Sequence, residues 1–171
     1  MKYENLKKLV LAGVFAALAC VATMVIQIPS PMNGYVNLGD CVVLLAGWLL
    51  GPVYGFAAAG VGSMLADILS GYAHYAVGTF LIKGVMALVA SLLCTAVQSG
   101  VGRITPARIV SGLAAEVIMV LGYFGYASLW LGKGLAAAAS IPGNIVQGVF
   151  GLVAAIAVYA VLNKSRVLAR I

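Results

Sequence analysis

Hydrophobic residues fill long, nearly continuous stretches of this chain, and most polar residues fall between them. The stretches cover residues 6–28, 35–50, 52–70, 75–97, 107–130 and 138–163. Because a helix needs about 20 mostly apolar residues to span a membrane, the pattern predicts six transmembrane helices. The second is short for a full span, with about 16 residues rising roughly 24 Å. We expect it either to be tilted little or to be supported by the loop at residues 28–34.

Turn-forming residues separate the stretches and support the number of helices. Pro29, Pro31 and Gly34 follow the first stretch, and Gly51-Pro52 makes a tight link between the second and third. The later breaks contain Gly71, Gly100, Gly102, Pro106, Gly132 and Gly134. We therefore expect a single six-helix transmembrane domain over residues 1–171.

The composition fixes the class of protein. With 64% hydrophobic and 8% charged residues, the chain has too few polar residues to cover the surface of a soluble domain. We predict an all-α integral membrane protein. A cleaved signal peptide is the alternative for the basic N-terminus and first stretch, but that stretch is longer than a usual signal core and five more follow it.

The basic residues predict the orientation in the bilayer. With an even number of spans, one side holds Lys2, Lys7, Lys8, Arg103, Arg108, Lys164, Arg166 and Arg170, whereas the loops on the other side hold Lys133. The positive-inside rule then places both termini in the cytoplasm. The net charge of +6 thus reports topology. A nucleic-acid partner is not expected, because the basic residues are split among three short segments.

Four ionisable residues lie inside or at the edge of apolar stretches: Asp40, Asp67, Lys83 and Glu116. Each costs about 2.5 to 3.5 kcal/mol at the centre of a spanning helix, so each is expected to face a partner, a cavity or a ligand. Two interpretations stay open for Asp67 and Lys83. They neutralise one another between adjacent antiparallel helices, or they contact a bound molecule.

The polar residues gather toward one side of the predicted bundle. In the predicted orientation the outer half holds Asp40, Asp67, Lys83, Asn144 and Gln147, with Glu116 deeper. Few polar groups remain in the inner half. This asymmetry predicts a pocket that opens outward and is closed below by packed apolar helices, in contrast to a continuous pore. The alternative for the two amide residues is hydrogen bonding across helices.

Aromatic residues continue the face of the helix that carries Glu116. Tyr123, Tyr126 and Trp130 follow it at steps of three and four residues, which is helical spacing. One carboxyl group topped by three rings suits a flat polar ligand. The alternative, an aromatic belt at the membrane interface, is the expected role for Trp130 and less so for Tyr123.

Catalytic and metal chemistry have little support in the sequence. The single histidine, His74, lies in an expected outer loop, and the three cysteines lack the spacing of a metal site. Ser63 lies one turn from Asp67 but has no histidine partner. We therefore expect no enzyme, no metal and no cofactor. The competing function is a self-sufficient secondary transporter or channel that uses Asp67, Lys83 and Glu116 as an ion or proton relay, although the chain shows no convincing internal repeat.

Several short segments resemble a known family. They are Asn37-Leu38-Gly39-Asp40, Leu44-Leu45-Ala46-Gly47, Leu50-Gly51-Pro52, Ala66-Asp67, Ile82-Lys83-Gly84, and Ile141-Pro142-Gly143-Asn144 with Gln147-Gly148. Together they resemble the substrate-binding S components of energy-coupling-factor (ECF) vitamin transporters. The resemblance implies a riboflavin-transporter-like bundle of six helices in the bacterial plasma membrane.

The resemblance also implies how the work is divided. An S component captures a vitamin or precursor from outside, with the loop after helix one, here residues 28–38, acting as a lid. It then docks on a transmembrane T component powered by two ATPase subunits. Docking in the family uses small residues on helix one, here Ala12, Gly13, Ala16 and Ala17. Since this chain has no Gly-rich phosphate loop ending in Lys-Ser or Lys-Thr, ATP is expected to be used by the partners.

The predicted substrate site combines the ionisable, amide and aromatic residues of the outer half. It comprises Asn37, Asp40, Asp67, Lys83, Glu116, Tyr123, Asn144 and Gln147. Rings next to amide and carboxylate groups suit a compact aromatic heterocycle with hydroxyl, amine or carbonyl groups. We favour pyridoxine or the hydroxymethylpyrimidine of thiamine, with riboflavin next.

Overall fold

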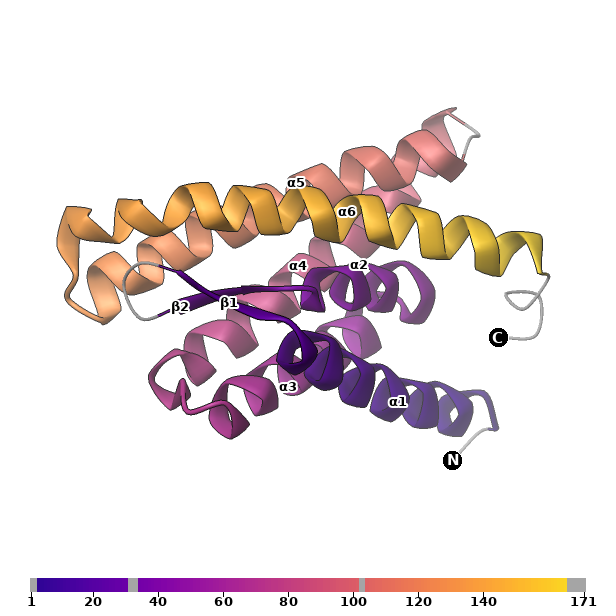
Figure 1. Cartoon of the computed structure of the whole chain (residues 1–171). Helices are drawn as coiled ribbons and strands as arrows, with labels where there is room; N and C mark the ends of the chain where they lie inside the picture. Colours follow the sequence, from indigo (N-terminus) through magenta and orange to yellow (C-terminus); the bar gives the residue numbers. More distant parts are fainter. Residues whose placement is uncertain (1–2, 31–33, 102–103, 166–171) are drawn as a thin grey trace.

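The computed structural model describes residues 3–30, 34–101 and 104–165, and this part of the chain is almost entirely helical (Figure 1). The helices are α1 (Tyr3–Val25), α2 (Gly39–Leu50), α3 (Pro52–Leu69), α4 (Ala73–Val101), α5 (Ile104–Gly125) and α6 (Ile141–Lys164). Two short strands, β1 (Gln27–Ser30) and β2 (Gly34–Asn37), connect α1 to α2. A π-helical turn (Tyr126–Trp130) and a 3-10 helix (Gly134–Ser140) connect α5 to α6.

Five apolar helices of the described residues are long enough to cross a membrane. They cover Asn5–Val25, Pro52–Leu69, Ala73–Val97, Pro106–Trp130 and Gly134–Lys164. The helix α2 has 12 residues, which at 1.5 Å per residue rise about 18 Å, well short of the hydrocarbon core of about 30 Å. A sixth complete span and the cytoplasmic position of both termini therefore stay predictions.

The segment between the first two helices differs from the prediction. Residues 35–37 were expected to begin the second helix, but they form β2, which pairs antiparallel with β1 from Gln27↔Asn37 to Ser30↔Gly34. Pro29 cannot continue a helix, and Tyr35 and Val36 are residue types that favour strands. The prediction missed this local preference because these residues adjoin a long apolar stretch. Helix α2 begins at Gly39, four residues later than expected.

The main apolar core lies next to the polar residues, on the side away from the hairpin. Its buried members include Leu44 of α2, Met86 of α4, Met119 of α5 and Leu152 of α6. On α2, α4 and α6 these residues follow the polar residues by three to five positions, about one helical turn. Packed side chains therefore close the bundle directly beneath the polar groups.

Small residues on α1 separate into two environments. Ala12 is buried with residues of α2 and α3, and a Cβ atom added to Gly62 of α3 would lie 2.3 Å from the carbonyl oxygen of Ala16. Both alanines therefore serve packing within the chain. Gly13 and Ala17 are exposed, so of the predicted docking residues these two face outward.

Candidate functional site

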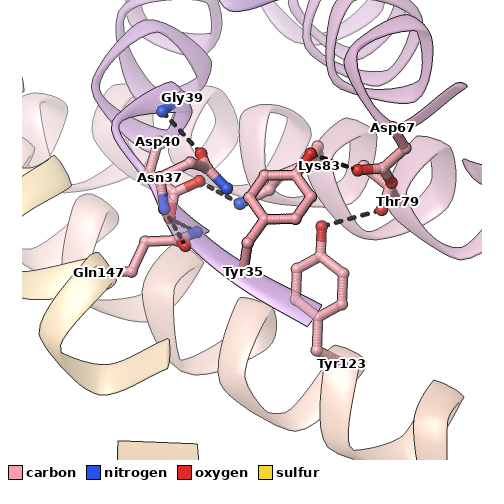
Figure 2. Close-up of polar contacts among 9 residues, drawn as sticks. All are labelled: Tyr35, Asn37, Gly39, Asp40, Asp67, Thr79, Lys83, Tyr123 and Gln147. Carbon is pink, nitrogen blue, oxygen red and sulfur yellow. Dashed lines mark hydrogen bonds and ion pairs between the residues drawn. The ribbon is translucent and has the colours of Figure 1, made fainter. Parts of the chain in front are cut away.

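A pocket lies between the β-hairpin and helices α3, α4, α5 and α6. Figure 2 shows Asn37, Asp40 and Gln147 on one side, and Asp67, Thr79 and Tyr123 on the other. The lining residues are Thr23, Gly34, Tyr35, Asn37, Ser63, Asp67, Tyr75, Thr79, Lys83, Tyr123, Ser140, Asn144 and Gln147. Of the eight predicted site residues, six line the pocket, and Asp40 and Glu116 lie behind it.

The floor of the pocket is an ion pair between Lys83 of α4 and Asp40 of α2. The side chains are 2% and 0% exposed, respectively. The second oxygen, Asp40 Oδ2, accepts a hydrogen bond of 2.7 Å from Gln147 Nε2. Because both carboxylate oxygens are engaged by the protein, Asp40 acts as a fixed counter-ion for Lys83.

The alternative in which Asp67 neutralises Lys83 is wrong, since among the described residues Lys83 pairs with Asp40. Asp67 instead accepts a hydrogen bond of 2.6 Å at Oδ1 from the hydroxyl of Tyr35 in β2. Burial, and next the nearby Asp67 carboxylate, raise the pKa of Tyr35 above its ordinary value. Tyr35 is therefore held as the protonated donor to Asp67.

The wall formed by α3 has open hydrogen-bonding positions. Asp67 is 4% exposed and Ser63, one turn earlier on the same face, is 1% exposed. Within the described part of the chain, Asp67 Oδ2 and Ser63 Oγ are buried without a hydrogen-bond partner. The Thr79 hydroxyl lies beside the Asp67 carboxylate (Figure 2), but its hydrogen bond is the one to the Tyr123 hydroxyl. Since buried polar groups usually have partners, these two atoms are available to a molecule in the pocket.

The opposite wall is formed by α6 and the end of the hairpin. The backbone N–H of Asn37 donates to Gln147 Oε1 at 2.9 Å, and Asn37 Oδ1 accepts from the backbone N–H of Gly39 at 2.8 Å. Gln147 thus joins the hairpin to the Asp40 carboxylate. Asn144 lies one turn earlier on α6 and lines the pocket with it.

Tyrosine rings complete the pocket from the side of α4 and α5. The hydroxyl of Tyr123 is 3.0 Å from Thr79 Oγ1, and its ring lies 5.4 Å from Lys83 Nζ. The ring centroids of Tyr75 and Tyr123 are 6.3 Å apart. Trp130 is 76% exposed, which agrees with the alternative that it belongs to the interfacial aromatic belt.

Glu116 is buried behind Asp40 and does not line the pocket. A Cβ atom added to Gly148 of α6 would lie 2.9 Å from Glu116 Oε2, so the glycine makes room for this carboxyl group. Neither carboxyl oxygen has a hydrogen-bond partner among the described residues. Its predicted role as a direct ligand contact therefore has no support in the geometry.

Several lining residues were absent from the predicted set, above all Tyr35, Ser63, Tyr75 and Thr79. Tyr35 was missed because residues 35–37 were assigned to a helix. Ser63 and Thr79 are single hydroxyls in apolar helices, and because a serine or threonine in a helix often bonds to its own backbone, neither stood out in the sequence as a site residue. Ser63, four residues before Asp67, offered the one usable signal, because that spacing places both on one helix face.

Comparisons with known proteins agree with this architecture. A family model described as "ECF-type riboflavin transporter, S component" matches residues 4–164. The chain belongs to this family. It is a family of transporter subunits and not of enzymes.

Individual relatives cover most of the chain. An uncharacterized protein of Pyrococcus woesei is 37% identical over 134 residues, which are 78% of this chain and 86% of that protein. The thiamine precursor transporter HmpT of Lactococcus lactis subsp. cremoris is 26% identical over 170 residues, covering 98% and 95% of the two chains. A solved S component of a bacterial ECF transporter superposes with a TM-score of 0.73 at 25% identity, covering 94% of this chain and 97% of that one.

Proposed function

We propose that this S component is a substrate-binding subunit that captures a vitamin or vitamin precursor from outside the cell. It delivers the molecule through a T component and two ATPase subunits. The observation that carries the proposal is the pocket beneath the hairpin, where buried polar atoms of Asp67 and Ser63 have no hydrogen-bond partner among the residues that the structure describes. Buried polar groups that line a pocket only for structural reasons usually have their hydrogen bonds filled by the protein.

The proposed ligand is a compact heterocycle of the pyridoxine or hydroxymethylpyrimidine type, with riboflavin next. Three tyrosines, Tyr35, Tyr75 and Tyr123, line the pocket and offer faces for a flat ring. The relative named a thiamine precursor transporter supports the pyrimidine.

Entry of the ligand requires the pocket to widen. The cavity volume is about 40 Å³, enough for about three water molecules at roughly 10 to 15 Å³ each. The hairpin is the element whose displacement widens it, because Tyr35 enters the pocket from β2 and bonds to Asp67. This displacement would also break the bonds from Asn37 to Gln147 and from Gln27 to Ser70. This supports a lid role for the segment between α1 and α2.

The proposed topology has both termini in the cytoplasm of a bacterial plasma membrane and α2 completing the bundle as a short sixth span. The hairpin then faces outward. The proposed docking face for the T component contains the exposed pair Gly13 and Ala17 on α1. Their small size allows close approach of another helix.

The competing function is a self-sufficient transporter or channel with Asp67, Lys83 and Glu116 as a relay. Two observations disfavour it: Lys83 is engaged by Asp40, and a packed core lies directly beneath the site. Reconstitution of the chain alone in liposomes separates the two functions, since gradient-driven uptake without partners would support the competitor.

The direct test is binding of water-soluble vitamins and their precursors to the purified protein by calorimetry without ATP. We expect one-to-one binding of at least one heterocycle. Absence of binding by the whole panel, with the protein shown to be folded by its cooperative thermal unfolding, would falsify the proposal.

A further inference from the structure

The α3 wall differs from the rest of the pocket in the kind of hydrogen bonds that it leaves open. Asp67 Oδ1 is occupied by the hydroxyl of Tyr35, whereas Oδ2 is buried without a partner among the described residues. A carboxylate oxygen accepts and does not donate hydrogen bonds. With Asp67 ionised, the ligand atom that meets Oδ2 must therefore carry a hydrogen.

Ser63 adds a second open position beside this acceptor. Its hydroxyl lies one turn from Asp67 on the pocket-lining face of α3 and is buried without a partner in the described residues. A hydroxyl donates once and accepts twice, so it adapts to either kind of ligand atom. Asp67 therefore imposes the requirement for a donor, and Ser63 supports it.

The charges around the pocket point to the same chemistry. Among the lining residues, Lys83 brings one positive charge and Asp67 one negative charge. The lysine charge is balanced by its ion pair with Asp40. Lys83 can still donate a hydrogen bond from its ammonium group, but it offers no unbalanced positive charge. A ligand carboxylate near Asp67 would meet a like charge at low dielectric, which is costly.

We infer that Asp67 Oδ2 is a specificity-determining acceptor that selects neutral or cationic heterocycles bearing an amino or hydroxyl donor and rejects their carboxylate counterparts. This inference rests on the proposed function and names the substrate class of the same site. Ring nitrogens or carbonyl oxygens of such a molecule accept from Lys83 on another edge.

The test compares matched ligands on matched variants by calorimetry. The probes are 4-amino-5-hydroxymethyl-2-methylpyrimidine, its analogue 2,5-dimethylpyrimidine that lacks both the amino and the hydroxyl donor, pyridoxine, its carboxylate counterpart 4-pyridoxate, and riboflavin. The variants are Asp67→Asn and Ser63→Ala, with Ser91→Ala as a control that removes a buried hydroxyl away from the pocket.

For wild type we expect 4-amino-5-hydroxymethyl-2-methylpyrimidine to bind at least about tenfold more tightly than 2,5-dimethylpyrimidine, the loss expected when a buried acceptor is left unpaired. We expect a preference of at least about tenfold for pyridoxine over 4-pyridoxate as well, because the ligand carboxylate would meet the like charge of Asp67. In Asp67→Asn the amide oxygen still accepts from Tyr35 and the amide N–H₂ replaces the open acceptor. The preference within each pair should therefore fall to about twofold or less, because the position no longer accepts. Ser63→Ala should weaken binding less, and Ser91→Ala should bind as wild type does.

The outcomes separate the two claims. If folded wild type binds no probe, the proposed function fails and the inference falls with it. If wild type binds a vitamin but prefers the carboxylate, or if Asp67→Asn keeps the wild-type preference, the inference alone is overturned. A merely structural role of Asp67 would weaken all probes by the same factor, which also overturns it. If Asp67→Asn does not fold, the wild-type preference within the pairs and the Ser63→Ala affinities decide.

Discussion

Two buried carboxylates in this protein lie in the same interior and have different surroundings. Asp40 has both oxygens engaged, by Lys83 and by Gln147, whereas Asp67 has one oxygen bonded to Tyr35 (Figure 2). The other oxygen of Asp67 is buried without a hydrogen-bond partner among the described residues. Both would be read from the sequence as intramembrane charges of equal interest. The difference teaches that burial identifies a candidate, while a hydrogen-bonding position left open on a residue that lines the pocket separates a ligand group from a structural group.

The largest expected effect is the loss of stability when the ion pair between Asp40 and Lys83 is broken. Asp40→Asn leaves Lys83 buried without its counter-ion, and breaking a buried pair from one side costs about 3 to 5 kcal/mol. The matched substitution at the pocket, Asp67→Asn, should lower the free energy of unfolding by about 1 kcal/mol or less, because the amide oxygen still accepts the hydrogen bond from Tyr35. Thermal unfolding in detergent measures both. Equal losses in the two variants would remove the distinction between the sites.

A double variant sharpens the same comparison. Lys83→Met alone should destabilise the protein by about 3 kcal/mol or more, but Asp40→Asn combined with Lys83→Met removes both charges and should recover part of that loss. The unfolding free energies of the two single variants and the double variant give the coupling. Additive losses would mean that the ion pair contributes no coupling of its own.

Helix α1 offers a similar contrast, between a small residue that is buried in the fold and one that is exposed. Ala12→Phe places a large ring against α2 and α3 and should destabilise the fold by about 1 to 3 kcal/mol. Ala17→Phe lies on the exposed face, so it should leave unfolding temperature and ligand binding unchanged while preventing assembly with the T component. Co-purification of the transporter subunits is the measurement. Full assembly of Ala17→Phe would move the docking face elsewhere.

The smallest expected effect concerns the hairpin. Tyr35→Phe removes the hydrogen bond to Asp67, worth about 1 kcal/mol, so ligand dissociation should become about fivefold faster. Because the pKa of Tyr35 is raised in the folded protein, the contribution of its hydroxyl to stability is fully present below the unfolded pKa of about 10. That contribution is lost as the pH rises from there through the higher folded pKa. The tyrosine hydroxyl therefore stays protonated from about pH 6 to 9, and the ratio of the ligand dissociation rates of Tyr35→Phe and wild type should stay constant over this range. Stopped-flow fluorescence measures both rates. A ratio that varies across this range would contradict the role of Tyr35 as a protonated hydrogen-bond donor to Asp67.

Much of the architecture was predictable from the sequence because membrane insertion depends on local composition. Apolar stretches long enough to cross a bilayer define most helices, and turn residues such as Gly51-Pro52 mark a break that the structure retains between α2 and α3. Likewise, the cost of a charge in lipid made Asp40, Asp67, Lys83 and Glu116 candidates. Membership of the S component family was also visible in short segments around these residues.

The tertiary structure alone decided which buried groups are partners. Asp40 and Lys83 are 43 residues apart, and no periodicity along one helix says which carboxylate a lysine of another helix meets. The β-hairpin likewise depends on Tyr35 reaching Asp67 and Asn37 reaching Gln147, contacts that exist only once α3 and α6 are in place. Hydropathy and insertion cost are properties of single segments, whereas the pairing of polar groups is a property of several segments packed together.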